Sequence, residues 1–314
     1  MGKDIFSRFD WVDTLKGIGI ILVVAGHIFG SYISGFIYLF HMPLFFFLAG
    51  YLYSPKPLRQ YLKSKSSNLL TPYSKYLLFF TAISTVYMIL NHDSISMILK
   101  SVIKSLYGGN LLTGWMGVFW FITVFFITQQ LFNFSIVKLG VKKTSAIAII
   151  SLALSYVASQ FIKITTPLNI IVTLHAFPFM CLGYLFKIHR IKVNTMAVIL
   201  ICVTCIWFFS SHKVEMKFDM KQSLYGIPFI SFITALALVV MAIIISSIIK
   251  CKPLEFIGIN SMNIMYIHQF IHLSIANKIF ESDFAIFTTT VTMSLFYCII
   301  INKINIPSIK KILS

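Results

Sequence analysis

Long runs without a charged residue follow one another along nearly the whole chain. They are apolar on all sides, and each is about long enough to cross ~30 Å of hydrocarbon as a helix. A transmembrane β-barrel would instead show segments of roughly ten residues that alternate between apolar and polar positions, so the pattern excludes it. The uncharged runs are residues 17–55, 76–92, 105–137, 144–162, 164–186, 193–212, 222–249, 256–277 and 284–302.

The first of these runs is long enough for two helices. Its polar stretch Ser31–Gly35 predicts a break, which leaves one helix over Leu15–Ile33 and a second over Phe36–Tyr53. The pattern therefore predicts an all-α, polytopic integral membrane protein with about ten transmembrane helices. No linker or low-complexity tract divides the chain, so we expect a single integral-membrane domain over residues 1–314.

Composition and charge agree with a membrane protein. Of the 314 residues, 58% are hydrophobic and only 11% are charged, too few to cover a water-soluble globule. With ten spans and both termini cytoplasmic, 17 of the 26 lysines and arginines fall on the cytoplasmic side. This bias and the attraction of anionic lipid account for the net charge of +17. We therefore expect the lipid bilayer of the cytoplasmic membrane, and no nucleic acid, as the partner of this charge.

Two connecting segments carry patterns of their own. The outer segment before residue 107 places apolar side chains at helical spacing and Lys100 and Lys104 on the other face. It predicts an amphipathic helix on the outer leaflet, either at the mouth of a cavity or as an interfacial anchor. The cytoplasmic segment "SPKPLRQYLKSKSSNLLTPY" predicts a short helix between prolines that carries Arg59, Lys63 and Lys65.

Ionisable residues inside the predicted spans are the candidates for chemistry, because they are expensive in hydrocarbon. His27 lies eleven residues beyond Lys16, which places it roughly 16 Å further along the helix, near the middle of the membrane. A neutral imidazole there can accept a proton from an alcohol. The alternative is a structural histidine bound to a backbone carbonyl or a serine. Asp13 and Lys16, one turn apart, can pair or face a shared cavity.

A second histidine follows in the next predicted helix. His41 stands in "FHMPLFFFLAG", where Pro43 removes a backbone donor. Two histidines on adjacent helices can face one cavity, so we expect His41 to be the neighbour of His27. Asp13 is too far along its own helix for direct contact with His27.

Polar and aromatic residues further along allow alternatives. Trp120 can stack on adenine, a thioester arm or a sugar, or pack among other aromatics. His268 and His272 have the one-turn spacing of a metal site, but without a third ligand we favour a hydrogen-bonded cavity wall. Asn260 and Ser261 begin the ninth predicted span and can cap it.

Several blocks resemble the membrane acyltransferase-3 family, in its branch similar to fucose 4-O-acetylases. The N-terminal block "DTLKGIGIILVVAGH", followed by "FHMPLFFFLAGYLY", is the most specific, because Lys16 and His27 match a basic residue, ten arbitrary residues and a histidine. Later segments are also similar, namely "WFI", "FPFMCLGYLF" and "FIGINSMNIMYIHQF".

The resemblance implies transfer of an acyl group, usually acetyl from cytoplasmic acetyl-CoA, to a hydroxyl of a surface glycan or its lipid-linked precursor, with no permanently bound cofactor or metal. It implies that His27 is catalytic, as general base or transient acyl carrier, and that Lys16 is its basic partner. Where the family has an Arg-x-Arg pair, this chain has Lys63 and Lys65, which with Asp13 and Arg59 form the expected donor site. The expected acceptor or cavity residues are Trp120, Asn260, Ser261 and His268.

Two other classes remain as alternatives. A transporter of a small molecule or lipid-linked sugar is disfavoured because no acidic residue falls within a predicted span and no internal repeat of the Lys16–His27 block is visible. A non-catalytic scaffold for glycan assembly predicts that His27→Ala leaves function intact.

Overall fold

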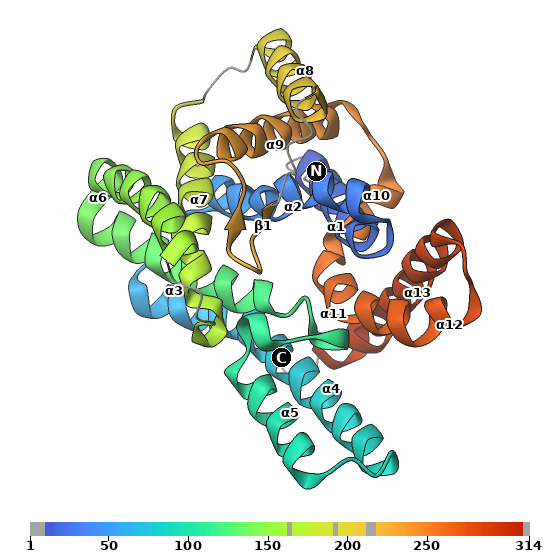
Figure 1. Cartoon of the computed structure of the whole chain (residues 1–314). Helices are drawn as coiled ribbons and strands as arrows, with labels where there is room; N and C mark the ends of the chain where they lie inside the picture. The colour runs from blue at the N-terminus through green and yellow to red at the C-terminus, as the bar shows by residue number, and fades with distance from the viewer. Residues whose placement is uncertain (1–9, 162–164, 191–193, 212–217, 310–314) are drawn as a thin grey trace. The chain divides into compact units, whose positions relative to one another are not determined.

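The computed structural model describes residues 10–161, 165–190, 194–211 and 218–309, and these are almost entirely helical (Figure 1). The helices and the single two-stranded hairpin are α1 (Asp10–Ile28), α2 (Ser31–Leu52), α3 (Leu58–Lys65), a π-helix (Ser66–Leu70), α4 (Thr71–Leu90), α5 (Ile95–Tyr107), 3₁₀ turns (Gly109–Leu111 and Gly114–Met116), α6 (Trp120–Phe161), a 3₁₀ segment (Pro167–Val172), α7 (Thr173–Ile188), α8 (Thr195–Ser211), β1 (Phe218–Asp219), β2 (Leu224–Tyr225), α9 (Ile230–Ile248), α10 (Lys252–Ile259), α11 (Ser261–Ile271), a second π-helix (His272–Ala276), α12 (Asn277–Ile279) and α13 (Asp283–Ile309).

The chain forms two compact units. Unit 1 comprises residues 1–37 and 241–314, and unit 2 comprises residues 38–240. Unit 1 holds α1, α10, α11 and α13, whereas unit 2 holds α3 to α8 and the hairpin. A single domain over the whole chain stays a prediction.

Seven helical segments among the described residues are long and apolar enough to cross a membrane. The all-α membrane architecture is therefore confirmed at this level, while the count of ten stays a prediction. The orientation also stays a prediction, because the termini lie outside the described residues. The seven segments are Trp11–Ile28, Ile33–Leu52, Leu58–Leu90, Gly114–Phe161, Pro167–Ile188, Ile230–Ile248 and Asp283–Lys303.

One predicted boundary was wrong, and a second was confirmed at a single residue. The first break lies at Phe29 and Gly30, and α2 already begins at Ser31, so the polar stretch Ser31–Gly35 is helical. The break expected near residues 138–143 is present at Gly140, a single residue at φ 75° and ψ 174° that separates the two parts of α6. Glycine adopts this left-handed φ without a Cβ clash, which lets one residue interrupt the helix where a loop was expected.

Both short connecting helices were predicted correctly. The amphipathic segment forms α5, and the Ser94 side chain caps it by accepting a hydrogen bond of 3.4 Å from the backbone N–H of Met97. The basic segment forms α3. Pro72 does not end that helical stretch, however, because a π-helix joins α3 directly to α4 and Pro72 occupies the first turn of α4.

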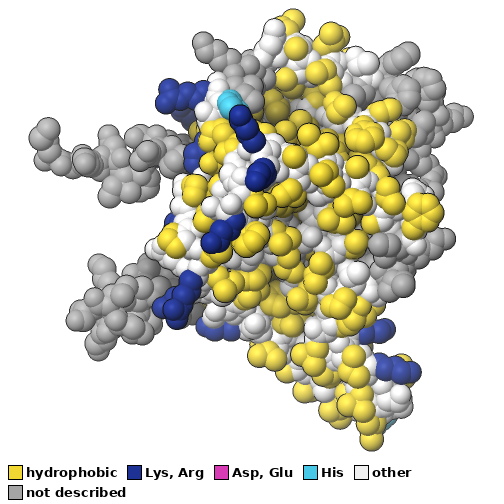
Figure 2. Space-filling view, turned by 90° about the vertical axis from the view of Figure 1, so that its left-hand side faces the viewer, with side chains coloured by type: hydrophobic (Ala, Val, Ile, Leu, Met, Phe, Trp, Pro, Cys, Tyr) yellow, Lys and Arg dark blue, Asp and Glu magenta, His cyan; other side chains and the backbone are white. Residues whose placement is uncertain are grey.

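In unit 2, two glycines let α2 and α7 cross at backbone contact. A Cβ on Gly50 would overlap the carbonyl of Met180, and a Cβ on Gly183 would overlap the carbonyl of Phe47. Small residues at such crossings allow dense packing where hydrophobic transfer supplies no attraction between helices in lipid. On the face shown in Figure 2, exposed hydrophobic side chains are far more numerous than lysines and arginines.

Candidate functional site

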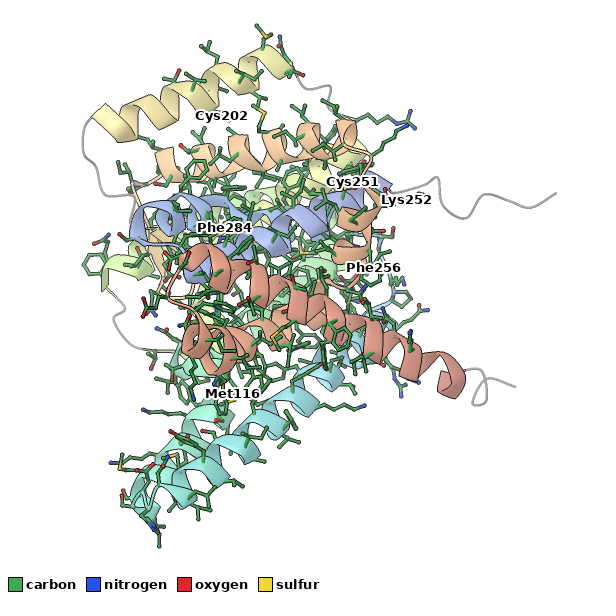
Figure 3. The ribbon with its side chains drawn as sticks, turned by 90° about the vertical axis from the view of Figure 1, so that its right-hand side faces the viewer. Met116, Cys202, Cys251, Lys252, Phe256 and Phe284 are labelled. Atoms are coloured by element: carbon green, nitrogen blue, oxygen red, sulfur yellow. The ribbon has the colours of Figure 1, made fainter. Side chains whose placement is uncertain are left out.

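A reciprocal glycine contact in unit 1 positions the segment that carries the predicted catalytic residues. A Cβ on Gly17 of α1 would overlap the carbonyl of Leu254, and a Cβ on Gly258 of α10 would overlap the carbonyl of Asp13. These contacts hold α1 against α10, the short helix that carries Lys252 and Phe256 in Figure 3. Gly17 therefore lies at the crossing of α1 and α10.

Asp13 and Lys16 form an ion pair at the first turns of α1. The Lys16 Nζ lies 2.8 Å from the Asp13 Oδ1, and the two side chains are 31% and 29% exposed. The predicted pairing is thus present in the structure. Because a partly solvated pair of this kind is weak, Lys16 can exchange its carboxylate partner for an anionic ligand at small cost.

The predicted catalytic histidine contacts a second histidine from α11. The ring centroids of His27 and His268 lie 5.6 Å apart, with 31° between the ring planes. His27 is partly exposed, whereas His268 is completely buried. His27 is therefore the member of the pair that a substrate can reach.

The hydrogen bonding of His268 fixes its tautomer. Its Nδ1 lies 3.0 Å from the carbonyl oxygen of Ile264, and because a carbonyl can only accept, Nδ1 carries the proton. The Nε2 atom then carries a lone pair, and it has no hydrogen-bond partner among the described residues. A buried acceptor of this kind, beside a partly exposed imidazole, can receive a hydrogen bond from a protonated partner.

A π-helix begins immediately after this histidine segment. His272, one turn after His268, is its first residue and is buried. Insertions of this type concentrate at functional sites because they displace side chains from the regular helical positions. In the part of the chain that the structure describes, no group of three or more His, Cys, Asp and Glu side chains is placed to hold a metal ion.

Asn260 does not have the predicted capping role. It precedes α11, but its side chain makes no capping hydrogen bond. Its Nδ2 instead donates to the carbonyl of Phe256 at 2.9 Å, and its Oδ1 accepts from Asn302 Nδ2 at 3.0 Å. Asn260 thereby joins α10 to α13, and Asn302 is a partner that the local pattern did not reveal. Ser261 is the first residue of α11 and is partly buried.

The other predicted catalytic and acceptor residues lie in unit 2. His41 is buried on α2, and its ring centroid lies 5.3 Å from that of Tyr38. Its expected proximity to His27, which belongs to unit 1, stays a prediction. Trp120 is buried at the start of α6, edge-on to Phe121 at 6.3 Å, so it packs among aromatics as one of the two alternatives proposed.

The predicted donor residues lie on α3. Arg59 and Lys63 are exposed, whereas Lys65 is partly buried with its Nζ 5.4 Å from the centre of the Tyr61 ring. The other π-helix among the described residues, Ser66–Leu70, follows Lys65 directly.

Beside Lys65 lies a buried polar cluster that sequence reasoning missed. Tyr53 donates to Asn133 Oδ1 at 2.7 Å, and Tyr61 donates to Gln129 Oε1 at 3.2 Å. Lys187 Nζ donates to the backbone carbonyl of Tyr53 at 2.8 Å. The signal available in the sequence was Asn133, because it is a polar side chain within an apolar run. Asn133 also begins the sequence "NFS", which fits a glycosylation pattern and draws attention away from a buried role.

The cluster carries positive charge that no carboxylate balances within the described residues. Lys65 and Lys56 are close enough for their charges to repel. The ion pair between Asp13 and Lys16, in the other unit, is the one that the described chain contains. Lysines that converge without an acidic partner favour an anion such as phosphate.

The long apolar helices define a membrane protein, and the imidazole pair of His27 and His268 and the separate lysine cluster are groups suited to transfer chemistry. The chain matches the family model described as "Acyltransferase domain" over residues 9–303 and belongs to that family. The family predicted from the N-terminal block is thus confirmed, while the branch similar to fucose 4-O-acetylases stays a prediction.

One relative is the nodulation protein NolL of Mesorhizobium japonicum (strain LMG 29417 / CECT 9101 / MAFF 303099). It is 30% identical over 194 residues, which cover 55% of this chain and 46% of NolL. The similarity thus spans about half the length of that relative. No solved structure matches the chain.

Proposed function

We propose that this protein transfers an acetyl group from cytoplasmic acetyl-CoA to a hydroxyl of a surface polysaccharide or its lipid-linked precursor. Membership of the acyltransferase family supports the reaction class. The observation that carries the proposal is the pairing of partly exposed His27 with fully buried His268, whose Nε2 has no partner among the described residues. We place the reaction in the cytoplasmic membrane.

In the direct route, His27 acts as a general base. Its imidazole removes the proton of the acceptor hydroxyl while the hydroxyl oxygen attacks the thioester carbonyl. The new C–O bond forms, the C–S bond breaks, and the proton passes to the departing CoA sulfur. His268 Nε2 is an acceptor that can stabilise His27 while it holds the proton.

In the two-step route, a nitrogen of His27 attacks the thioester first. An acetyl-imidazole forms as CoA departs, and the acceptor hydroxyl then takes the acetyl group and regenerates His27. Both routes use the same substrates and products. The two are separated by trapping acetyl-enzyme with labelled acetyl-CoA in the absence of acceptor.

The proposed binding site for the acetyl-CoA donor consists mainly of cationic side chains. Lys16 lies about three turns of α1 from His27, within the reach of a pantetheine arm. Arg59, Lys63 and Lys65, together with Lys187, are proposed as charge partners of the CoA phosphates, with Asp13 holding Lys16 in place. Lysine contributes a point charge and lacks the bidentate fork of arginine, so several lysines are expected to share the phosphates.

The test is acetyl transfer by the purified full chain in lipid nanodiscs. The acceptor is the host's surface polysaccharide after mild alkaline removal of its acetyl esters, and the readouts are CoA thiol release and new acetyl signals by NMR. His27→Ala is expected to lower transfer at least ~100-fold, the contribution of a positioned general base. The control is His92→Asn, at an exposed turn with φ 59° that asparagine tolerates. Equal transfer by wild type and His27→Ala refutes the catalytic role of His27, and absence of transfer by both refutes the proposal and favours the transporter or the scaffold.

A further inference from the structure

The hairpin formed by β1 and β2 makes a polar contact network in unit 2 that the proposed chemistry does not use (Figure 1). Lys221 Nζ donates to the carbonyl of Leu112 at 2.7 Å, and Asn169 Nδ2 donates to the carbonyl of Lys221 at 2.9 Å. Asn110 Nδ2 donates to Gln222 Oε1 at 3.1 Å. The hairpin turn is thus bound to two segments distant in sequence, the turns near residues 109–116 and the 3₁₀ segment Pro167–Val172.

The base of the hairpin is fixed by stacked rings. Tyr225 stacks on His175 with 3.9 Å between ring centroids and 5° between planes. His175 Nδ1 lies 2.9 Å from Ser155 Oγ, and Ser155 donates its own proton to Leu152 at 2.7 Å, so His175 is the donor to Ser155. The hairpin turn therefore projects from a rigid base.

The backbone around the turn holds uncommon conformations. Leu168, Asn169 and Ser223 adopt left-handed φ angles of 54°, 59° and 56°. Gly109 has φ 59°, and a Cβ there would lie 2.5 Å from the backbone nitrogen of Asn169. Such conformations are unfavourable for residues with a side chain, and they cluster where a binding site is pre-organised.

Two charged side chains on the turn retain hydrogen-bonding capacity. Asp219 Oδ1 accepts from the backbone N–H of Lys221 at 2.9 Å, and the backbone N–H of Gln222 also bonds this carboxylate, which has further lone pairs for a ligand. Lys221 uses one of its three protons on Leu112. Burial raises the pKa of the Asp219 carboxyl and lowers the pKa of the Lys221 ammonium. Both groups are therefore poorly solvated and still able to bond a ligand.

This combination selects among ligand classes. An apolar ligand would leave both charges unsatisfied, and a polyphosphate would be repelled by Asp219. A polyol matches, because each hydroxyl can donate to the carboxylate and accept from the ammonium. Trp115, in the adjacent 3₁₀ turn Gly114–Met116, supplies a partly buried aromatic ring near the same segment.

We propose that Asp219 and Lys221 bind the acceptor carbohydrate, an inference that rests on the proposed acetyl transfer. Asp219 donates no proton in this role: its carboxylate accepts from a sugar hydroxyl, and Lys221 donates to a neighbouring sugar oxygen. The carboxylate also lies close enough to act electrostatically on Tyr38, whose ring contacts His41. Tyr38 therefore links the surroundings of Asp219 to His41, the predicted catalytic histidine of unit 2.

The test measures binding separately from transfer. The probe is a set of oligosaccharides prepared from the host's surface polysaccharide after mild alkali, and binding to the full chain in nanodiscs is followed by saturation-transfer NMR. Asp219→Asn and Lys221→Met are each expected to weaken binding at least ~10-fold, since each removes a charged hydrogen-bond partner. Asparagine keeps the Oδ1 acceptor for the Lys221 N–H, so the turn is retained.

Matched controls come from the same unit. Asp93→Asn and Lys100→Met make the same chemical changes at positions outside the hairpin network and are expected to bind as wild type does. Lys221→Arg keeps a cation with several N–H donors and is expected to recover part of the binding. In transfer assays, Asp219→Asn raises the KM for the acceptor ~10-fold and leaves the KM for acetyl-CoA unchanged.

The outcomes separate the two proposals. Binding by wild type and His27→Ala, with loss in Asp219→Asn, supports the site, and it does so even where wild type transfers no acetyl group and the proposed function fails. Equal binding by wild type and Asp219→Asn, or absence of binding to wild type, overturns the site irrespective of transfer.

Discussion

At the scale of single residues, His27 and His268 were both identifiable because ionisable side chains stand out in apolar runs. The contact between the two histidines could not be predicted from the sequence, because helical periodicity indicates which face of a helix a residue occupies and not which helix packs against that face. Proximity in sequence favours His41 as a neighbour of His27, which stays a prediction, and the structure adds His268 from more than 200 residues away.

The His268 contact makes a kinetic prediction. His268→Phe keeps a buried ring but removes the Nε2 acceptor, so we expect kcat to fall about 10- to 100-fold, within the range of a lost buried acceptor to a charged group. The KM values for acetyl-CoA and acceptor are expected to stay within about twofold because neither substrate is bound by this atom. His268→Gln retains a donor and an acceptor and is expected to recover part of kcat. A fall in folded protein without a selective effect on kcat contradicts the prediction.

The raised pKa of Asp219 makes a stability prediction whose sign can be stated. Because burial raises the pKa in the folded protein, the folded state binds the proton more tightly than the unfolded chain, and stability falls as pH rises through the window above the ordinary value of 3.8. At pH 7 the carboxylate therefore opposes folding, and Asp219→Asn is expected to have a Tm equal to or above that of wild type. The difference is expected to shrink toward pH 4. A lower Tm at pH 7 than wild type would show that Asp219 stabilises the turn through its charge.

At the scale of elements, the apolar runs located most helices, and the errors lie where short-range signals fail. The break expected near Gly140 is present, but it takes only one residue, and a single glycine does not reveal the length of a break. The two π-helices, after Lys65 and Ile271, differ from an α-helix by one extra residue per turn. Over five residues, this difference does not change the hydrophobic periodicity of the sequence enough to be recognised.

The glycine crossing between α1 and α10 predicts a large effect from one methyl group. Gly258→Ala would force its Cβ into the carbonyl of Asp13, which as backbone cannot rotate away. We expect a loss of about 1–3 kcal/mol in stability, typical of overpacking, and a reduced yield of folded protein in detergent. Gly35→Ala is the control, because nothing lies within 4 Å of its added Cβ and alanine is the better helix former. Equal thermal unfolding of the two variants contradicts the crossing.

At the scale of the whole molecule, the contacts that build polar clusters join positions far apart in the chain. Tyr53 and Asn133 are 80 residues apart, and Lys187 reaches Tyr53 across 134. Composition therefore predicted the class of protein, and the N-terminal block predicted the family, whereas the lysine cluster required the fold. From the sequence alone, Lys187 is one of many lysines predicted to be cytoplasmic. In the structure, its hydrogen bond to the carbonyl of Tyr53 holds its ammonium near Tyr61 and Lys65.

The lysine cluster predicts that different parts of the molecule bind the two substrates. Lys187→Met and Lys65→Met each remove one charge from a group that lacks a carboxylate partner among the described residues, so we expect the KM for acetyl-CoA to rise roughly 5- to 20-fold. The KM for the acceptor is expected to stay unchanged, the opposite of the pattern for Asp219→Asn. Raising the salt concentration should weaken donor binding more in wild type than in either variant, because each variant has one positive charge fewer for the salt to screen.

Lys75→Met is the matched control for these lysines. Lys75 is exposed on α4 in the same unit, and its removal is expected to leave both KM values within twofold of wild type. Dephospho-acetyl-CoA, which lacks one phosphate, sharpens the assignment: if a given lysine binds that phosphate, its variant loses little further affinity for the truncated donor while wild type loses much. If removing the phosphate weakens donor binding as much in both lysine variants as in wild type, the losses are additive and neither lysine binds that phosphate. Arg59 and Lys63 would then be its remaining partners on α3.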